Sequence, residues 1–292
     1  MVIVPGPASH ELGLKVAELL GAKIMPIEYK SFPDGESYIR FTGDVKGAHV
    51  VIIQTISPPQ DTHLVQALLM ADAAKDLGAK KIILVAPYFA YTRQDRRFLE
   101  GEAVSLQTVV RLLIATGVKG LITINSHSPN LLEKTGIKVR NLSAIGLLAE
   151  YFKAQGLSGA ISLAPGKRAA VMAVEAERIL KGGCDFLKTR RDLVTGKAVV
   201  EVGKLGVKDR DAIIFDDIIS TGGTMAEAVR IVKELGARRV YAACVHPLLI
   251  GGAGEKILKN GAEKIVGTDT VPSPIGAISV APLIADALRR RL

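Results

Sequence analysis

Short runs of β-branched and other apolar residues alternate with helix-length amphipathic segments along the chain. The predicted strands lie at 2–4, 24–28, 49–55, 80–86, 119–124, 137–142, 158–163, 211–216, 238–245 and 263–268. The predicted helices lie at 9–20, 61–77, 103–116, 144–154, 167–180 and 222–235. This alternation predicts an α/β fold, in which largely parallel sheets are flanked by helices on both faces.

One joint between helix and strand occurs twice. Residues 75–82 read Lys-Asp-Leu-Gly-Ala-Lys-Lys-Ile, and residues 233–240 read Lys-Glu-Leu-Gly-Ala-Arg-Arg-Val. In each, a helix ends at a glycine free to adopt positive φ, and a basic pair precedes a buried strand. Because the copies lie about half a chain apart, the sequence predicts two similar domains, with the boundary near residue 143.

Two segments interrupt the pattern. Residues 37–42 alternate polar and apolar side chains, which predicts a half-exposed antiparallel strand, and the preceding residues 32–36 form a turn with two carboxylates. Residues 187–210 are polar and contain Lys188-Thr189-Arg190-Arg191. That composition predicts a hairpin or a mobile loop.

Composition limits the class of partner. The chain of 292 residues carries a net charge of +9, but its aromatic content is 4% and its basic residues are scattered. Nucleic acid is therefore not the expected partner, whereas phosphorylated small molecules account for the charge. No long apolar run or signal-peptide pattern occurs, so we expect no membrane span and a cytoplasmic location. Cys184 and Cys244 lack metal-ligand spacing and are predicted to be small buried residues.

The most informative motif follows the predicted strand 211–216. Two acids, Asp216 and Asp217, are followed by a loop that leads into a helix, which is the usual ligand position in an α/β sheet. The loop carries Ser220, Thr221, Gly222, Gly223 and Thr224. Backbone N–H groups at a helix start bind anions, the glycines permit close approach, and the hydroxyls add donors. The acids would repel phosphate and therefore suit sugar hydroxyls, so the loop is predicted to bind a phosphorylated ribose rather than to be an ordinary capped turn.

This loop resembles the phosphoribosyl-pyrophosphate motif shared by type I phosphoribosyltransferases and phosphoribosyl-pyrophosphate synthetases (ribose-phosphate pyrophosphokinases). A second segment, residues 87–97, favours the synthetases. Its arginines and Gln94 could clamp a polyphosphate, or could form a solvated charged loop. It is similar to the Pro-Tyr…Arg-Gln-Asp segment of the synthetases, which the transferases lack. The resemblance implies that Arg93 and Gln94 contact ATP.

The same resemblance implies roles for further residues. Residues 32–36 are similar to the adenine loop, in which an aromatic ring stacks on the base and acids accept hydrogen bonds from its amino group. In the family this loop serves a neighbouring subunit, which implies self-association as a dimer or hexamer. His127, which on its own would more often be structural, matches a histidine that binds magnesium and ATP phosphates. The implied ATP-binding residues are Phe32, Asp34, Gly35, Glu36, Arg93, Gln94 and His127.

The resemblance also implies the reaction. Lys188 and Arg190 match a Lys-x-Arg pair on a catalytic loop, which would stabilise charge as pyrophosphate passes from ATP to C1 of ribose 5-phosphate with Mg²⁺ present. The implied ribose 5-phosphate ligands are Arg190, Asp216, Asp217, Ser220, Thr221, Gly222, Gly223 and Thr224. No Walker or G-x-G-x-x-G motif offers another ATP site.

The resemblance runs nearly end to end, and the compact length is similar to that of archaeal members. It implies two phosphoribosyltransferase-like domains. The ATP side would comprise 1–143 plus 279–292, because the last helix packs back in the family, and the ribose 5-phosphate side would comprise 144–278.

One position departs from the family pattern. Gly166 stands where the family has an aspartate that helps to position magnesium or ribose, and Lys167 or Arg168 could partly replace the missing cation charge. Three hypotheses therefore remain open. The first is an active diphosphokinase, the second a non-catalytic homologue that binds nucleotide and regulates a partner, and the third a phosphoribosyltransferase.

Overall fold

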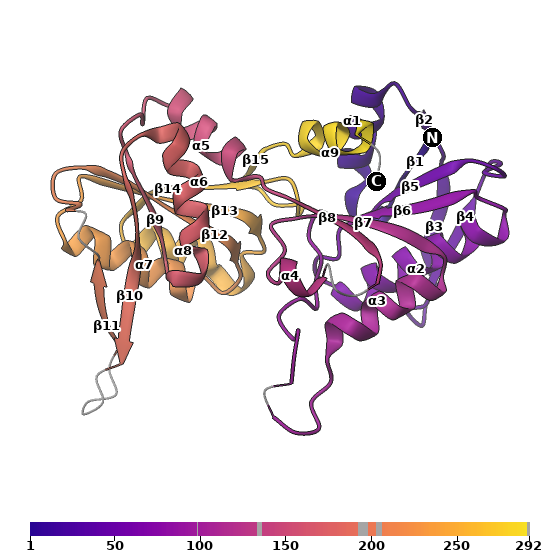
Figure 1. Cartoon of the computed structure of the whole chain (residues 1–292), viewed down its shortest axis with the longest axis horizontal. Coiled ribbons are helices and arrows are strands. Elements are labelled where there is room, and N and C mark those ends of the chain that lie inside the picture. Colours follow the sequence, from indigo (N-terminus) through magenta and orange to yellow (C-terminus); the bar gives the residue numbers. More distant parts are fainter. Residues whose placement is uncertain (98, 133–135, 192–197, 203–205, 291–292) are drawn as a thin grey trace. The chain divides into compact units, whose positions relative to one another are not determined.

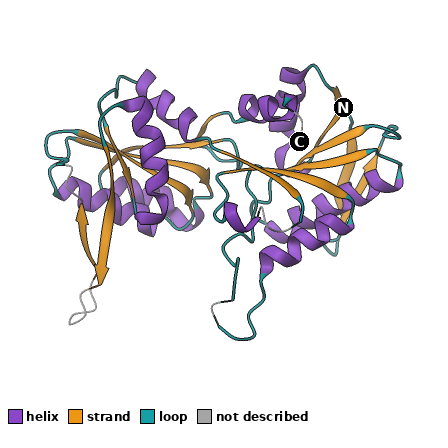
Figure 2. Cartoon of the chain, viewed as in Figure 1, coloured by secondary structure: helices purple, strands orange, loops and turns teal. Residues whose placement is uncertain are grey.

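The computed structural model of the chain describes residues 1–292 except 98, 133–135, 192–197, 203–205 and 291–292. The chain divides into two compact units. The first comprises Met1–Ser143, Thr270–Pro272 and Ser279–Leu292, and the second comprises Ala144–Asp269 and Ser273–Ile278. Each unit contains one main sheet with helices on both faces (Figures 1 and 2). The predicted α/β class is therefore confirmed.

The main sheet of the first unit is parallel throughout, in the order β2-β1-β5-β6-β7-β8. Its strands are β1 (Val2–Pro5), β2 (Lys23–Ile24), β5 (His49–Ile53), β6 (Lys81–Val85), β7 (Val118–Ile124) and β8 (Lys138–Leu142). Helices α1 (His10–Leu20) and α9 (Ala281–Arg289) cover one face, and α2 (Gln60–Asp76) and α3 (Ser105–Ala115) cover the other (Figure 1). Covered on both faces, β5 and β6 are nearly continuous apolar runs, as parallel strands require.

A separate two-stranded ribbon carries the turn at residues 32–36. Its strands, β3 (Ile27–Ser31) and β4 (Ser37–Phe41), pair antiparallel, which confirms the antiparallel strand predicted there. The single strand predicted at 24–28 is wrong. The chain divides into β2 and β3, because Pro26 has no N–H to donate and interrupts the ladder.

The main sheet of the second unit runs in the order β11-β10-β9-β12-β13-β14-β15, and β10–β11 is its antiparallel pair. Its strands are β9 (Ile161–Ala164), β10 (Cys184–Arg191), β11 (Ala198–Val202), β12 (Asp211–Ile219), β13 (Arg239–Pro247), β14 (Ala262–Thr268) and β15 (Gly276–Ile278). Helices α5 (Ile145–Ala154) and α6 (Ala170–Leu180) lie on one face, and α7 (Gly223–Glu234) and α8 (Ala253–Lys259) on the other (Figure 1). The short helices of the chain are η1 (Pro7–Ser9), α4 (Pro129–Leu132), η2 (Lys167–Ala169) and η3 (Ile250–Gly252).

The two cysteines have different surroundings. Cys244 in β13 is fully buried, as predicted, whereas Cys184 is only partly buried, so the prediction for Cys184 is wrong. The reason is its position as the first residue of β10, whose pairing with β11 begins at Leu187. Burial raises the pKa of both thiols, which keeps them protonated.

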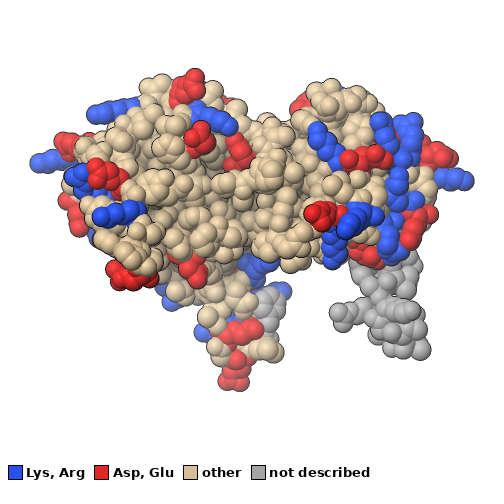
Figure 3. Space-filling model, turned by 180° about the vertical axis from the view of Figure 1, so that it is seen from behind, with Lys and Arg blue, Asp and Glu red and all other residues tan. Residues whose placement is uncertain are grey.

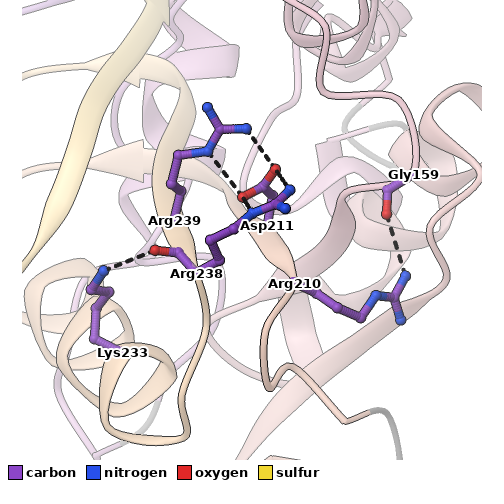
Figure 4. Close-up of polar contacts among 6 residues, drawn as sticks. All are labelled: Gly159, Arg210, Asp211, Lys233, Arg238 and Arg239. Atoms are coloured by element: carbon purple, nitrogen blue, oxygen red, sulfur yellow. Dashed lines mark hydrogen bonds and ion pairs between the residues drawn. The ribbon is translucent and has the colours of Figure 1, made fainter.

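Two arginines hold a single aspartate at the amino ends of β12 and β13 (Figure 4). Arg238 donates to Asp211 at 2.9 and 2.6 Å, and Arg239 donates to it at 3.0 and 2.7 Å. The hydrogen bonds from Arg239 and then Arg238 hold the pKa of the buried Asp211 carboxyl well below its usual range. Because Asp211 and Arg239 are also register partners, this cluster fixes how β12 pairs with β13.

Replacing Asp211 with alanine leaves both guanidinium groups without this partner. We expect the free energy of unfolding at neutral pH to fall by about 2–3 kcal/mol, the value for hydrogen bonds to a charged group. Because the folded pKa is depressed, the contribution is present above the unfolded pKa of about 3.9 and is lost as the pH falls below it. The difference between wild type and variant should therefore shrink in urea titrations at more acidic pH.

Glu227→Ala is the matched control, since Glu227 pairs with Arg230 on an exposed helix surface. An exposed pair contributes about 0.5 kcal/mol. Equal destabilisation by the two substitutions would contradict the role given to Asp211.

Candidate functional site

The order of strands in the second unit locates a ligand position. Strand β9 pairs with β10 on one side and with β12 on the other. The next strands along the chain, β10 and β11, lie on one side of β9, and the later strands β12 to β15 lie on the other side, so the strand order reverses at β9. Ligands of open α/β sheets bind outside the carboxyl ends of the strands at such a switch point. The loop after β9 contains Gly166 and the loop after β12 contains Ser220. The predicted phosphate loop therefore lies at the switch point.

The phosphate loop is built around Gly222. This residue has φ of 71°, and a Cβ there would lie 3.0 Å from the carbonyl oxygen of Ala253. Both the positive φ and the close approach to Ala253 require a glycine at this position. The main chain of the segment after β13 contacts the loop, since Ile250 N donates to Ser220 O at 3.0 Å. Thr221 and Thr224 are exposed, so their hydroxyls and the first N–H groups of α7 are available to an anion.

The two acids lie within β12, because this strand runs to Ile219 instead of ending at residue 216 as predicted. The carboxylate of Asp216 accepts a hydrogen bond from the backbone N–H of Asp217 at 3.0 Å. Burial, followed by the neighbouring charge of Asp217, raises the pKa of Asp216 well above its usual value. A carboxyl group in this state can hold a proton and donate it in a hydrogen bond to a sugar oxygen.

The loop after β9 brings positive charge beside these acids. Ile214 of β12 pairs with Leu163 of β9, and β9 ends at Ala164, so the loop that carries Gly166 begins beside the carboxyl-terminal part of β12. A Cβ on Gly166 would meet no atom within 4 Å, so there is space for a side chain. The charge of Arg168 acts on Asp216 and lowers its pKa, against the larger effect of burial.

Acidic residues are sparse at this edge of the sheet. Among the residues that the structure describes, no group of three or more His, Cys, Asp or Glu side chains could hold a metal ion.

Lys256 is a residue that the sequence did not single out. Its Nζ atom lies 3.6 Å from the position that a Cβ on Gly223 would occupy, at the first residue of α7. No motif around residue 256 signals this position, because the proximity arises only when α8 packs against α7.

In the first unit, two predicted ATP-binding segments lie on neighbouring strands. Arg93 and Gln94 follow β6, and His127 follows β7, which pairs with β6. A hydrogen bond of 2.6 Å from Ser128 Oγ to Asp95 Oδ2 joins the two loops. The carboxyl edge of β6 and β7 therefore brings a glutamine, an exposed arginine and a histidine into one region.

The predicted adenine loop is an exposed turn at the end of the ribbon. Phe32 N donates to Glu36 O at 2.8 Å, and Glu36 N donates to Asp34 Oδ1 at 3.2 Å. Gly35 has φ of 96°, which closes the turn. Phe32 is 40% exposed, and its ring packs edge-to-face on Tyr38 with centroids 6.0 Å apart. Lys30 Nζ also lies over this ring, 5.1 Å from its centroid, so a partly exposed aromatic residue stands beside a lysine and two carboxylates.

The predicted catalytic pair lies on the hairpin β10–β11. The backbone of Lys188 pairs with Glu201 and that of Arg190 with Val199. Of the two alternatives predicted for this region, the structure has the hairpin. The side chains of Lys188 and Arg190 lie outside what the structure describes.

The second unit thus has a largely parallel sheet with two acids and a glycine-containing loop at its switch point. Comparisons with known proteins show the family in which this arrangement occurs. The profile described as the N-terminal domain of ribose phosphate pyrophosphokinase matches residues 1–117, and that of a phosphoribosyl synthetase-associated domain matches residues 196–291. Together with a relative 42% identical over 99% of the chain, these matches show that the chain belongs to the ribose-phosphate pyrophosphokinase family, which confirms the resemblance in its sequence.

Similar proteins cover almost the whole chain. A ribose-phosphate pyrophosphokinase of Methanothermobacter thermautotrophicus is 42% identical over 99% of this chain and 100% of its own length. One of Saccharolobus solfataricus is 36% identical over 93% of each chain. The crystal structure of phosphoribosylpyrophosphate synthetase from Mycobacterium smegmatis has a TM-score of 0.89 and 28% identity, covering 99% of this chain and 97% of that one.

Two further observations concern the surface. No helix within the described part of the chain is long and apolar enough to cross a membrane. On the face drawn in Figure 3, basic and acidic side chains are interspersed instead of forming one basic stripe.

Substituting Gly222 with alanine tests the construction of the phosphate loop. The left-handed conformation costs about 1–2 kcal/mol for a residue with a Cβ, and contact with the Ala253 carbonyl adds to this. We expect urea unfolding to show a larger loss of stability than for Gly21→Ala. Gly21 also has positive φ, but a Cβ there would meet nothing within 4 Å. Equal losses would show that the close approach at Gly222 is unimportant.

Proposed function

We propose that this protein transfers the β,γ-pyrophosphoryl group of ATP to the C1 hydroxyl of ribose 5-phosphate, giving phosphoribosyl pyrophosphate and AMP. The observation that carries the proposal is the anion loop beside Asp216 and Asp217 at the switch point of the second unit. Membership of the ribose-phosphate pyrophosphokinase family supports the choice of reaction.

In this proposal the second unit binds ribose 5-phosphate. The N–H groups and hydroxyls of the loop take the phosphate, because a helix start favours an anion. Asp216 and Asp217 hydrogen-bond the ribose hydroxyls, which suits two acids of which one is inclined to keep its proton. The proposed ligands are Asp216, Asp217, Ser220, Thr221, Gly222, Gly223 and Thr224, with Arg190 from the hairpin.

The first unit binds ATP in the same proposal. The exposed Phe32 ring stacks on adenine, and Asp34 and Glu36, on the turn closed at Gly35, accept hydrogen bonds from its amino group. Arg93, Gln94 and His127 contact the polyphosphate from the edge of β6 and β7. The adenine turn serves a second copy of the chain, so the protein self-associates at least as a dimer.

The reaction is a displacement at phosphorus. The C1 oxygen of ribose 5-phosphate forms a bond to the β-phosphorus of ATP and loses its proton, while the bond from that phosphorus to the α,β-bridging oxygen breaks and AMP leaves. No protein nucleophile is needed. Lys188 and Arg190 supply positive charge as negative charge develops on the transferred oxygens.

Magnesium is the proposed cofactor, and it would neutralise charge on the ATP phosphates when bound. His127 is the proposed protein ligand, and Gly166 provides none. The sparse acidic residues described above fit an ion that arrives largely coordinated by nucleotide and water.

The direct test is AMP formation with ATP, ribose 5-phosphate and Mg²⁺, and with each omitted in turn. We expect AMP only when all three are present. Folded protein that binds ATP but forms no AMP would instead support the regulatory hypothesis. Stabilisation by adenine or orotate, but not ATP, in a thermal-shift assay would support a phosphoribosyltransferase.

Gly166→Asp tests whether a carboxylate in the loop after β9 alters metal use. The open space at Gly166 accommodates the side chain. We expect activity to be retained and half-saturation to occur at lower Mg²⁺, because a carboxylate adds a ligand of the kind this ion prefers. Gly166→Asn is the control for size without charge. A rise from almost no activity to substantial activity in the Asp variant would favour the regulatory hypothesis for the natural chain.

Phe32→Ala tests the adenine turn. Stacking of a base on an aromatic ring contributes about 1–3 kcal/mol, so KM for ATP should rise at least about fivefold while KM for ribose 5-phosphate stays unchanged. Tyr29→Ala is the control, since Tyr29 is another exposed aromatic residue of the ribbon. If both variants kept the wild-type KM for ATP, Phe32 would have no role in binding adenine.

A further inference from the structure

Helix α8 places a lysine at the phosphate loop. Helices α7 and α8 pack together, and the Lys256 Nζ atom lies 3.6 Å from the position of a Cβ on Gly223. The close approach of Gly222 to Ala253 fixes where α8 begins relative to the loop. Backbone packing thus sets where the main chain of Lys256 lies relative to the phosphate loop.

The amino group of Lys256 is available for a ligand. The side chain is exposed, and in the described part of the chain no hydrogen bond or ion pair engages its Nζ atom. Other lysines of this unit are engaged, since Lys233 donates to the carbonyl oxygen of Arg238 and Lys264 donates to Tyr151. Lys256 therefore contributes a full positive charge where the start of α7 contributes only a partial one.

The surrounding charges indicate which end of a sugar phosphate would lie near the ammonium group of Lys256. Asp216 and Asp217 make the β12 side of the site acidic, and Arg168 acts on Asp216 from the loop after β9. A sugar phosphate binds best with its hydroxyls toward the acids and its phosphate toward the start of α7. Lys256 lies at that second end, beside Gly223.

We propose that Lys256 binds the 5-phosphate of ribose 5-phosphate together with the N–H groups and hydroxyls of the phosphate loop. This inference rests on the proposed function, because it names a further ligand of the same site. Lys256 is a binding residue that distinguishes a phosphorylated sugar from an unphosphorylated one, and it takes no part in the transfer itself.

The test uses Lys256→Met, which removes the ammonium group and keeps most of the apolar stem. A charge-assisted hydrogen bond to phosphate at a solvent-accessible site should contribute about tenfold in affinity. We expect the Kd for ribose 5-phosphate, measured calorimetrically without ATP, and its KM to rise about tenfold, whereas KM for ATP stays unchanged. Lys256→Arg keeps the charge and should remain within about threefold of wild type.

Lys259→Met is the matched control, because Lys259 is an exposed lysine of the same helix one turn further from the loop. It should leave both substrates unaffected. Wild-type affinity for ribose 5-phosphate in Lys256→Met, or equal weakening in the two variants, would overturn the inference.

The outcome is separable from that of the proposed function. If wild type forms no AMP but binds ribose 5-phosphate through Lys256, the reaction is wrong and the assignment of Lys256 stands. If wild type forms AMP and Lys256→Met has an unchanged KM for ribose 5-phosphate, the reaction stands and the assignment is wrong.

Discussion

The parallel pairing of β9 with β12 is the constraint on which the candidate site depends. It sets two loops side by side at the carboxyl ends of neighbouring strands, one carrying Gly166 and Arg168 and the other carrying the anion loop. At the opposite end of β12, Asp211 and its two arginines hold the strand in register with β13. Side chains alternate between the two faces along a strand. A shift of β12 by one residue in its register would therefore turn Asp216 and Asp217 each to the opposite face of the sheet.

The carboxyl edge of the sheet in the second unit carries acidic groups on β12 and basic groups on two other elements. Burial keeps the Asp216–Asp217 pair inclined to hold a proton, and positive groups approach from two other elements, Arg168 from the loop after β9 and Lys256 from α8. A site of this kind suits a ligand with hydroxyls at one end and a phosphate at the other. Among the residues that the structure describes, no group of three or more acidic, histidine or cysteine side chains could hold a metal ion.

The phosphate loop could be predicted from the sequence because the pattern on which the prediction rests is local. Two acids, hydroxyl residues and glycines occur together between an apolar run and an amphipathic helix. The fold class was equally accessible, since alternation of strand and helix leaves few other arrangements. The antiparallel strand at Ser37–Phe41 also followed from its own alternating pattern.

What the sequence could not supply depends on packing between distant segments. Lys256 reaches the loop only because Gly222 lets Ala253 approach. Strand β12 continues to Ile219, past two acids that ordinarily end a buried strand, because β13 offers partners as far as Pro247. The exposure of Cys184 follows from where the pairing of β10 with β11 begins.

In the proposed reaction the protein transfers a pyrophosphoryl group as one unit. Phosphorus NMR of ATP and ribose 5-phosphate incubated with the protein and Mg²⁺ tests it most directly, because it follows each phosphorus atom. We expect the β- and γ-phosphorus signals of ATP to be replaced together by those of a diphosphate on C1 of ribose, with one AMP formed for each diphosphate. Formation of ADP, or release of inorganic phosphate without a C1 diphosphate, would contradict it.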